Sequence, residues 1–223
     1  MRQRATTSPP DLGLSPREHA TLARLDTPLR IQAFVDELPI NHELDGETLS
    51  SVRDVLRLRR AHCIEGAFVA ACALWVHGSP PLVWHLDCAP RDWPHVVALF
   101  RRGRCWGAIS KSNHAALRYR DPVYRTLREL AMSYFHEYCD DAGTKTLRSY
   151  SIAFDLRRLD PAAWVTCPTP CRVAHDALAD ARHYALVTPG QARALAPRTA
   201  FEQRAAQAVE YPRTARPRRV RGS

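Results

Sequence analysis

Hydrophobic residues follow a helical spacing through the first sixty residues, interrupted by clear start and stop signals. Ser15-Pro16-Arg17-Glu18 offers a serine N-cap, a proline at the first helical position and a glutamate at the third. Thr27-Pro28 repeats this start before an apolar stripe that Pro39 ends. Asp45-Gly46 then turns the chain into residues 47–60, whose apolar side chains again share one face. The pattern predicts three amphipathic helices that pack on a common core.

The stretch from Cys63 to His77 differs from these helices because it is apolar almost all round. Its sequence, CIEGAFVAACALWVH, carries small residues along its length. Gly78 is a suitable C-cap, and Pro80-Pro81 prevents the helix from continuing. A helix without a polar face is buried on every side. We therefore expect this segment at the centre of the fold.

Three short strand-like runs follow, over residues 82–88, 95–100 and 105–110. The polar link Arg101-Arg102-Gly103-Arg104 joins the last two into an antiparallel hairpin. Helices precede the strands, and no βαβ alternation is present. This order predicts an α+β fold in which the apolar, cysteine-bearing helix packs on a short antiparallel sheet.

The second half of the chain is predicted to contain two further helices and a strand. Asp121-Pro122 is expected to cap a long helix, in which five residues share helical spacing: Val123, Leu127, Leu130, Tyr134 and Tyr138. Gly143 precedes a strand within residues 146–156, and a weaker helix is expected from about Arg172.

Charge is concentrated at the two ends of the chain. The formal net charge is +9, but residues 189–223 hold eight Arg and two Glu, and residues 1–10 add two Arg. The part between them is close to neutral. We interpret residues 1–14 as a disordered tail, 15–188 as one domain and 189–223 as a basic, disordered tail. Such a tail can contact polyanions weakly and without sequence preference.

No run approaches the roughly 18 apolar residues of a membrane helix, and the polar N-terminus lacks the apolar region of a secretory signal. We therefore expect a cytoplasmic protein without membrane contact, whose seven cysteines are mostly free thiols. Cys167, Cys171 and His175 have part of the spacing of a zinc site, but the second cysteine pair of such sites is missing. No metal and no cofactor is expected.

Cys63 is the candidate nucleophile. It stands at the start of the buried helix, where unpaired N–H groups and the positive end of the helix dipole favour thiolate over thiol. A thiolate with a histidine partner is the arrangement of a nucleophilic cysteine. The alternative is a small apolar core residue, like Cys72 in the same helix. His62 adjoins Cys63 but is expected to point to a different side of the chain.

Among the ten histidines, the register of the hairpin favours His95 as the partner of Cys63. With a loop centred on Arg102-Gly103, His95 lies opposite Ser110, and directly opposed residues point to the same face of a sheet. A slip of one residue would place Ile109 or Lys111 there instead and reverse the facing.

These residues resemble the core of the transglutaminase-like superfamily. The resemblance is carried by Cys-x-Glu-Gly-Ala at Cys63, by His95 on a strand 32 residues later and by Trp106 shortly before position 110. It covers about residues 28–115, and the stretch that follows is similar to uncharacterised bacterial members. The resemblance implies a papain-like fold, with Cys63 as nucleophile and His95 as general base of a peptidase, amidase or acyl transferase.

Ser110 stands where that superfamily has an aspartate. A serine can accept a hydrogen bond from an imidazole, but it does not stabilise the imidazolium as a carboxylate does. Asn113, Asp92 and Asp87 are the other candidates for orienting His95, and the sequence leaves the choice open.

Two further charged residues lie beside these positions. Glu65, two residues into the buried helix, is expected to complement the helix dipole. Lys111 is expected to be a solvated surface residue, or else to bind an acidic group of a substrate.

Three functions are compatible with these features. The first is a cysteine-dependent acyl-transfer enzyme that acts on a peptide or another amide-containing substrate. The second is a catalytically degenerate protein of the same fold that serves as a binding or scaffold module. The third is a nucleic-acid-associated protein that binds through its arginine-rich tail.

Overall fold

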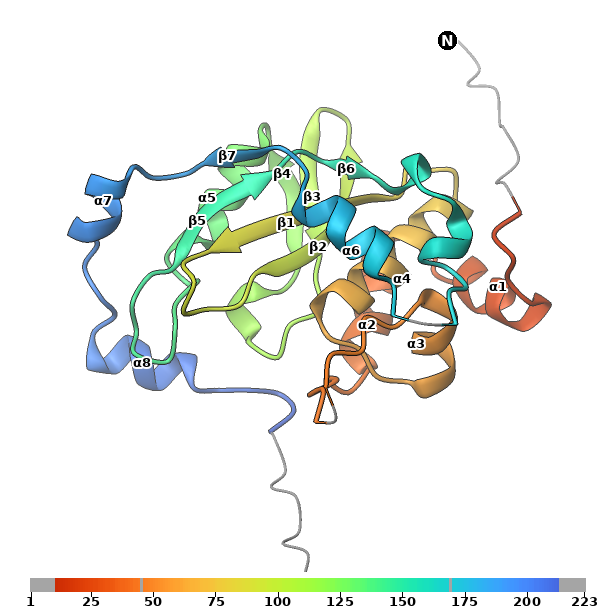
Figure 1. Ribbon diagram of the computed structural model, residues 1–223, viewed down its shortest axis with the longest axis horizontal. Helices are drawn as coiled ribbons and strands as arrows, with labels where there is room; N and C mark the ends of the chain where they lie inside the picture. The colour runs from red at the N-terminus through yellow and green to blue at the C-terminus, as the bar shows by residue number, and fades with distance from the viewer. Residues whose placement is uncertain (1–10, 45, 169, 213–223) are drawn as a thin grey trace, which may run out of the picture.

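The computed structural model describes residues 11–44, 46–168 and 170–212. It is an α+β structure in which helices from the first third of the chain gather at one end of an antiparallel sheet (Figure 1). The α-helices are α1 (Pro16–Ala23), α2 (Pro28–Glu37), α3 (Val52–Leu58), α4 (Cys63–Val76), α5 (Leu127–Phe135), α6 (Arg172–Ala179), α7 (Pro189–Ala194) and α8 (Ala200–Ala206). The strands are β1 (Leu82–Cys88), β2 (His95–Arg102), β3 (Cys105–Ile109), β4 (Arg120–Tyr124), β5 (Leu147–Ser151), β6 (Phe154–Asp155) and β7 (His183–Ala185).

The first two helices begin at the predicted caps. The Ser15 hydroxyl accepts the backbone N–H of Glu18, and the Glu18 carboxylate accepts that of Ser15, which completes a capping box at α1. Thr27 caps α2 in the same position. The helix expected over residues 47–60 is shorter, because it starts only after Ser51, whose hydroxyl accepts a backbone N–H of the first turn.

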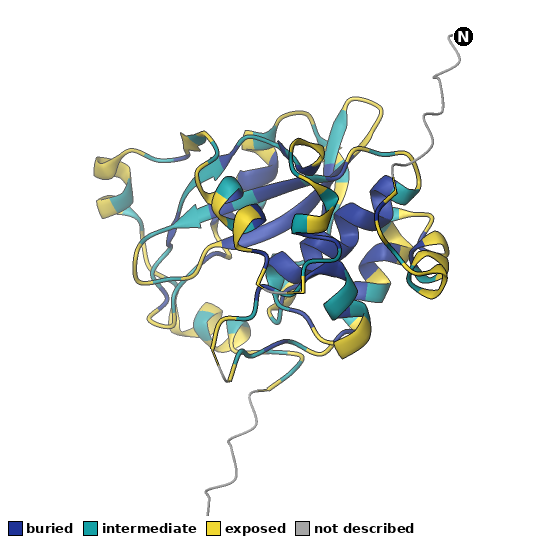
Figure 2. Cartoon of the chain, turned by 45° about the vertical axis from the view of Figure 1, so that its right-hand side comes forward, coloured by how far each residue is buried: buried dark blue, intermediate teal, exposed yellow. Residues whose placement is uncertain are grey.

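Helix α4 is the buried centre of the fold, as its composition predicts. All its residues from Ile64 to Trp75 are buried, and the dark-blue interior in Figure 2 runs through α4 and the central strands. Helices α1, α2 and α3 pack around α4, and α4 packs on β2 and β1. The coarse prediction of a buried, cysteine-bearing helix on an antiparallel sheet is therefore confirmed.

The sheet has the strand order β4-β3-β2-β1-β5-β7, with β6 also pairing with β1, and all its pairs are antiparallel. Both faces of its centre are covered. Val96 and Ala98 of β2 pack into the cluster around α4, whereas Val97 and Leu99 pack into the cluster around α5. A strand buried on both faces reads as a continuous apolar run, which explains the sequence HVVALF.

The register of the β2–β3 hairpin differs from the predicted one by two residues. Phe100 lies opposite Gly107, because the tight turn is formed by residues 103–104, with a positive φ of 61° at Gly103. An even shift leaves each side chain on the predicted face. Ser110, which follows β3, therefore still shares a face with His95 but is its diagonal neighbour rather than its direct partner.

The long helix predicted after Asp121-Pro122 is wrong in its first part. These two residues lie in β4, an edge strand in which exposure alternates along the chain. An edge position tolerates proline because one side of the strand makes no ladder bonds. Helix α5 starts only after Thr126, which forms a capping box with Glu129. Tyr138 lies beyond the end of α5.

The later elements differ from the prediction mainly in their extent. The strand expected within residues 146–156 is divided into β5 and β6. Helix α6 begins at Arg172 as expected but ends at Ala179, and the residues after it form β7 at the other edge of the sheet.

The chain ends pack more extensively than their charge suggests. Leu12 belongs to the core around α4. Within the segment expected to be a disordered tail, α7 and α8 both begin with capping boxes. The Arg198 guanidinium donates to the Glu137 carbonyl oxygen at 2.7 Å, and the Lys145 ammonium to that of Ala196 at 2.8 Å. Packed elements thus occur within both segments expected to be tails; residues 1–10 and 213–223 lie outside the described residues.

Within the described ranges, no helix is long and apolar enough to cross a membrane. All seven cysteines lie in these ranges, and none of them forms a disulfide bond.

Candidate active site

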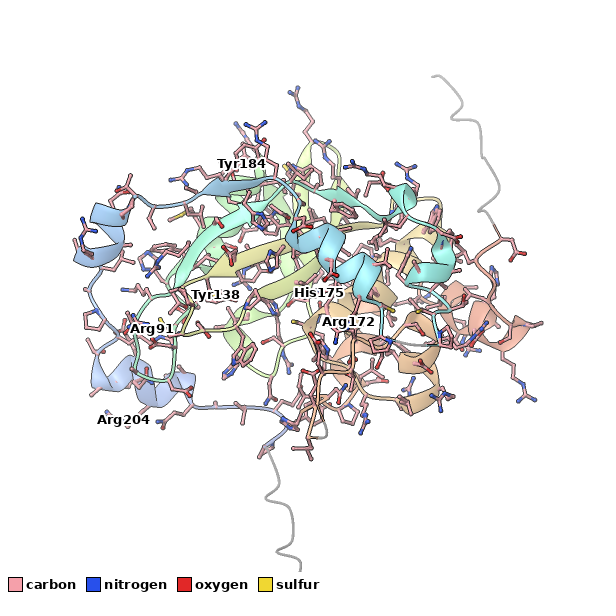
Figure 3. The ribbon with its side chains drawn as sticks, viewed as in Figure 1. Arg91, Tyr138, Arg172, His175, Tyr184 and Arg204 are labelled. Carbon is pink, nitrogen blue, oxygen red and sulfur yellow. The ribbon has the colours of Figure 1, made fainter. Side chains whose placement is uncertain are left out.

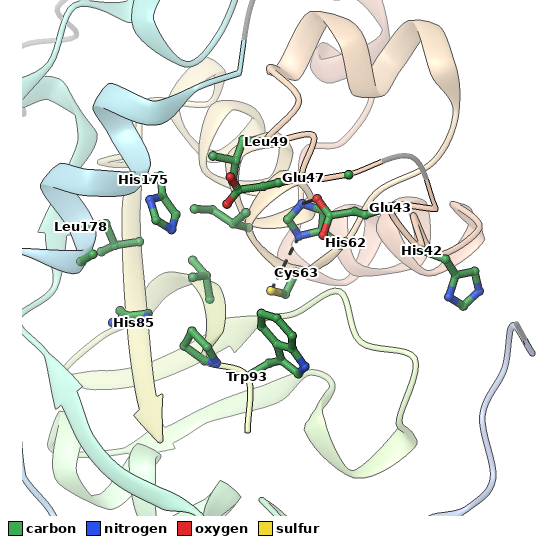
Figure 4. A pocket seen from close by; sticks show the side chains of 15 residues that line it. His42, Glu43, Glu47, Leu49, His62, Cys63, His85, Trp93, His175 and Leu178 are labelled. Atoms are coloured by element: carbon green, nitrogen blue, oxygen red, sulfur yellow. Dashed lines mark hydrogen bonds and ion pairs between the residues drawn. The ribbon is translucent and has the colours of Figure 1, made fainter. Parts of the chain in front are cut away.

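Cys63, the first residue of α4, lies where two cavities meet. The larger cavity has a volume of about 740 Å³ and is shown in Figure 4; the smaller has about 340 Å³. Both are lined by Cys63, Trp93 and Pro94. The Cys63 side chain is half-buried, whereas Cys72, nine residues further along α4, is fully buried. Cys63 is thus the cysteine of α4 that faces open space.

His95 is the first residue of β2, and it is held by Ser110. Its Nε2 atom lies 2.8 Å from the Ser110 hydroxyl oxygen, and that hydroxyl donates to the Leu117 carbonyl oxygen at 2.6 Å. The Ser110 oxygen therefore accepts the proton on Nε2, which leaves Nδ1 as the nitrogen that exchanges protons. The Gln32 side chain fixes the Ser110 backbone through two hydrogen bonds, both of 2.9 Å.

The other candidates for orienting His95 have different partners. Asn113 makes two hydrogen bonds with the backbone of Tyr211, at 3.0 and 2.8 Å. Asp92 accepts a hydrogen bond from a threonine hydroxyl just before β5, and Asp87 accepts one from a serine on β5 at 3.1 Å. Of the four alternatives that the sequence leaves open, the structure brings Ser110 to the imidazole.

His62 lies beside the sulfur, which corrects the expectation that it points elsewhere. Its Nδ1 atom is 4.0 Å from the Cys63 Sγ atom (Figure 4). Its Nε2 atom lies 3.3 Å from Glu43 Oε1 and 3.5 Å from Glu65 Oε1. The Glu65 carboxylate also accepts the backbone N–H of His62 at 2.9 Å, which places His62 as the N-cap of α4 and keeps its ring beside the first turn.

The charges around Cys63 favour a thiolate. Burial alone would raise the pKa of the Cys63 thiol, but the hydrogen bonds and charges of His62 and His95 hold it well below its usual value. Burial would likewise lower the pKa of His62, but Cys63, Glu43 and Glu65 raise it to about 10. Burial raises the pKa of Cys72, in the same helix, to about 12. A perturbed thiol in a cavity is a typical feature of a functional cysteine.

Glu65 is fully buried, and its carboxylate accepts hydrogen bonds from several donors. Its carboxylate accepts hydrogen bonds from the Thr48 hydroxyl at 2.7 Å and from the Ser50 backbone N–H at 2.8 Å. It thus ties the loop before α3 to the first turn of α4. This placement agrees with the expected position near the helix dipole and adds a negative charge beside His62.

Lys111 is buried, not a solvated surface residue. Its ammonium donates to the backbone carbonyl oxygens of Leu38 and, at 3.3 Å, Asp36, and burial lowers its pKa to about 8. A Cβ atom on Gly66 would lie only 2.5 Å from the Lys111 Cβ atom. Gly66 therefore lets α4 approach residues 110–111 closely, which brings Ser110 near the turn that carries Cys63.

The larger cavity is bounded by α6, by residues 42–43 and 46–49 and by the start of β2. Arg172 and His175 project from α6 (Figure 3), and Arg172 pairs with Glu47 across the cavity rim at 2.8 Å. The wall of the larger cavity is largely apolar and includes Leu49, Ile64, Val96 and Leu178. His85 also lines it; burial lowers the pKa of His85 to about 4, so this ring is neutral near pH 7.

The smaller cavity is more polar. Asp92, Asp140 and Lys111 line it together with His95. The Tyr138 hydroxyl, at its wall, donates to the Trp93 carbonyl oxygen and holds the loop between the two cavities.

Cys167 and Cys171, the pair considered for zinc, pack in and against the hydrophobic core. Cys171 is buried, and its thiol lies 3.9 Å from the Trp164 carbonyl oxygen. His175 pairs with the neighbouring Asp176 at 2.8 Å. Among the described residues, no group of three His, Cys, Asp or Glu side chains is arranged to hold a metal ion.

No protein-family model matches this chain, and no curated protein shows significant similarity to it.

Sequence reasoning missed His62, Glu43 and Trp93. A local signal for His62 was present: a histidine directly before Cys63, with Glu65 three positions later, has the spacing of a capping box. Glu43 had no such signal. It reaches the site from a loop 19 residues before His62, where its backbone adopts a positive φ of 48°.

Proposed function

We propose that this protein is a cysteine-dependent acyl-transfer enzyme, in which Cys63 is the nucleophile and His95 moves the proton. One observation carries the proposal: the Cys63 thiol is flanked by two imidazoles at the point where two cavities meet. A nucleophile must reach the bond between two parts of a substrate, and a cavity on each side provides room for both parts.

A transglutaminase-like, papain-like core is the fold that we propose for this site. The support is the placement of the cysteine at the start of a buried helix, of His95 on strand β2 and of the orienting Ser110 after the neighbouring strand β3. The departure is the hydroxyl at Ser110, where a carboxylate is expected.

The reaction follows from these positions. The Cys63 thiol gives its proton to His95 Nδ1, and the thiolate attacks the carbonyl carbon of an amide, so that a C–S bond forms. We expect the backbone N–H groups in the first turn of α4 to stabilise the oxyanion. His95 returns the proton to the leaving amine as the C–N bond breaks. Water or a second amine then attacks the thioester and gives a proton to His95. His95 passes this proton to the sulfur as the C–S bond breaks.

The substrate is a peptide or another amide-containing molecule. The apolar wall of the larger cavity suits an apolar group on one side of the scissile bond. The polar lining of the smaller cavity suits a polar group on the other side.

A degenerate binding module is the alternative with the same fold. It would be favoured by a Cys63 sealed from solvent, or by a His95 whose far nitrogen has no polar partner. The half-buried Cys63 and the 2.8 Å contact between His95 and Ser110 favour an enzyme instead.

The nucleic-acid alternative rests on residues 213–223, which contain five Arg and no acidic residue. Removing these residues, while keeping α7 and α8, tests it. If they bind nucleic acid, their removal abolishes binding, and the affinity of the full chain falls steeply with salt.

Thiol reactivity tests the main proposal. Iodoacetamide at pH 6.5, followed by peptide mapping, is expected to modify Cys63 at least about tenfold faster than Cys139, because the thiolate is the reactive species. Cys139 is the matched control: it is also half-buried, and burial raises its pKa. If Cys63 reacts no faster than Cys139, the proposal is wrong.

A further inference from the structure

Cys63 has a second imidazole beside it, that of His62. His62 is the N-cap of α4, and its Nδ1 atom lies 4.0 Å from the Cys63 sulfur. Its side chain is only 18% exposed. Because His62 and Cys63 are consecutive residues at a helix start, their separation is set by the backbone and not by a flexible loop.

The far side of His62 faces two carboxylates, Glu43 at 3.3 Å and Glu65 at 3.5 Å. Both are held in place by other groups. Glu65 is fully buried and accepts the Thr48 hydroxyl, while Glu43 accepts the Thr48 backbone N–H at 2.8 Å. Glu43 also adopts a positive φ of 48°. This backbone conformation costs free energy in a residue other than glycine, and the surrounding contacts must offset that cost.

We propose that His62 stays protonated near neutral pH and stabilises the thiolate that Cys63 becomes when it gives its proton to His95, with Glu43 and Glu65 as the counter-charges of His62; His95 alone takes up and returns the proton. The proposal rests on the acyl-transfer function above and deepens it. It explains how a site can function with a serine behind His95: the carboxylate charge that Ser110 does not supply is present behind the other imidazole.

The surrounding charges agree with this division of roles. The groups that act on the Cys63 sulfur are His62, His95 and the Tyr138 hydroxyl. The groups that act on His62 are Cys63, Glu43 and Glu65. The contact with His62 lowers the pKa of Glu43 to about 2, and the charge of His62 also keeps the pKa of Glu65 below its usual value despite burial. Both carboxylates are therefore ionised near pH 7.

The two imidazoles cannot exchange roles. An imidazolium whose pKa lies near 10 is too weak an acid to serve as the general acid near pH 7. His95 Nε2 instead contacts a neutral group, the Ser110 hydroxyl. The proton that reaches the leaving amine therefore comes from His95.

The pH dependence of Cys63 alkylation by iodoacetamide tests this assignment. We expect a midpoint well below the usual thiol value of about 8.5 in the full-length protein. His62→Asn should raise this midpoint by at least one pH unit, and Glu43→Gln should raise it by less. His62→Lys, which keeps a positive charge, should restore part of the shift. Asparagine is a favoured N-cap, so α4 retains its cap in the first variant.

The outcomes separate the role proposed for His62 from the proposed acyl-transfer function. If His62→Asn leaves the midpoint unchanged while His95→Gln raises it, the role assigned to His62 is wrong and the acyl-transfer proposal stands. If the wild-type midpoint lies at the usual thiol value, both are wrong. If His62→Asn does not fold, the Glu43→Gln variant and a His62→Gln variant, which also removes the positive charge, decide: a wild-type midpoint in both overturns the inference.

Discussion

The His95 Nε2 atom lies 2.8 Å from the Ser110 hydroxyl oxygen, which itself donates its proton to a backbone carbonyl. Ser110 is thus an acceptor toward the imidazole, as a carboxylate would be, but it carries no charge. In this site, the group that orients an imidazole and the groups that supply negative charge lie behind different histidines. Ser110 orients one imidazole, whereas Glu43 and Glu65 lie behind the other, His62.

Ser110→Ala removes the acceptor that fixes the tautomer of His95. We expect a roughly 100-fold slower reaction with p-nitrophenyl acetate, as lost acid–base alignment gives, and a loss of about 1–3 kcal/mol in the free energy of unfolding, because buried polar groups lose their partner. Ser112→Ala is the matched control, since that hydroxyl accepts the His114 backbone N–H at 3.0 Å. Equal rates for the two variants would contradict the role of Ser110.

Gly66→Ala places a Cβ atom 2.5 Å from the Lys111 Cβ atom. Because both α4 and residues 110–111 are buried, the clash should cost about 1–3 kcal/mol in unfolding free energy, measured by urea denaturation. It should also slow the reaction of Cys63, since Ser110 moves with Lys111. Gly190→Ala, whose Cβ atom would meet nothing closer than 3.9 Å, should change neither quantity. A Gly66→Ala protein of wild-type stability would show that the close approach is not required.

Trp93 is 83% exposed and lines both cavities. We expect Trp93→Ala to weaken the binding of esters with an apolar acyl group, seen as a higher KM for p-nitrophenyl hexanoate. The unfolding free energy should change by no more than about 0.5 kcal/mol, because the side chain packs little. Phe201→Ala, which removes an aromatic ring of 72% exposure from α8, is the control. An equal rise of KM in both variants would argue against Trp93 as part of the substrate site.

His62 should also affect how stability depends on pH. Its pKa is raised from about 6.5 to about 10 on folding. A raised pKa contributes stability that is full below pH 6.5 and is lost as the pH rises through 10. The difference in unfolding free energy between the wild type and His62→Asn should therefore shrink from pH 6.5 to pH 10. Urea denaturation at both pH values measures it, and a difference that grows over this range would contradict the raised pKa.

The predictable parts of this fold are those with local signals. Capping residues located α1 and α2, and the all-apolar sequence located α4 and β2. The start of α5 was misplaced because Pro122 reads equally well as a helix start and as an edge-strand residue. Charge alone suggested a disordered C-terminal segment, since composition does not reveal that its backbone finds partners such as Asn113.

The candidate site was predictable to a similar degree. Cys63, His95 and Ser110 followed from a helix start and from strand facing, which survived a register error because the shift was even. The contribution of Glu43 could not be predicted, because it depends on a loop conformation with positive φ and on contacts between segments distant in sequence.

The most direct test of Cys63 as the nucleophile is to trap the acyl-enzyme. The protein is mixed with p-nitrophenyl hexanoate, quenched in acid and analysed by intact and peptide mass spectrometry while p-nitrophenolate release is followed. We predict one hexanoyl group on the Cys63 peptide and a burst of about one p-nitrophenolate per chain, both absent from Cys63→Ala. Acylation at another residue, or equal p-nitrophenolate release by the wild type and Cys63→Ala, would contradict the account.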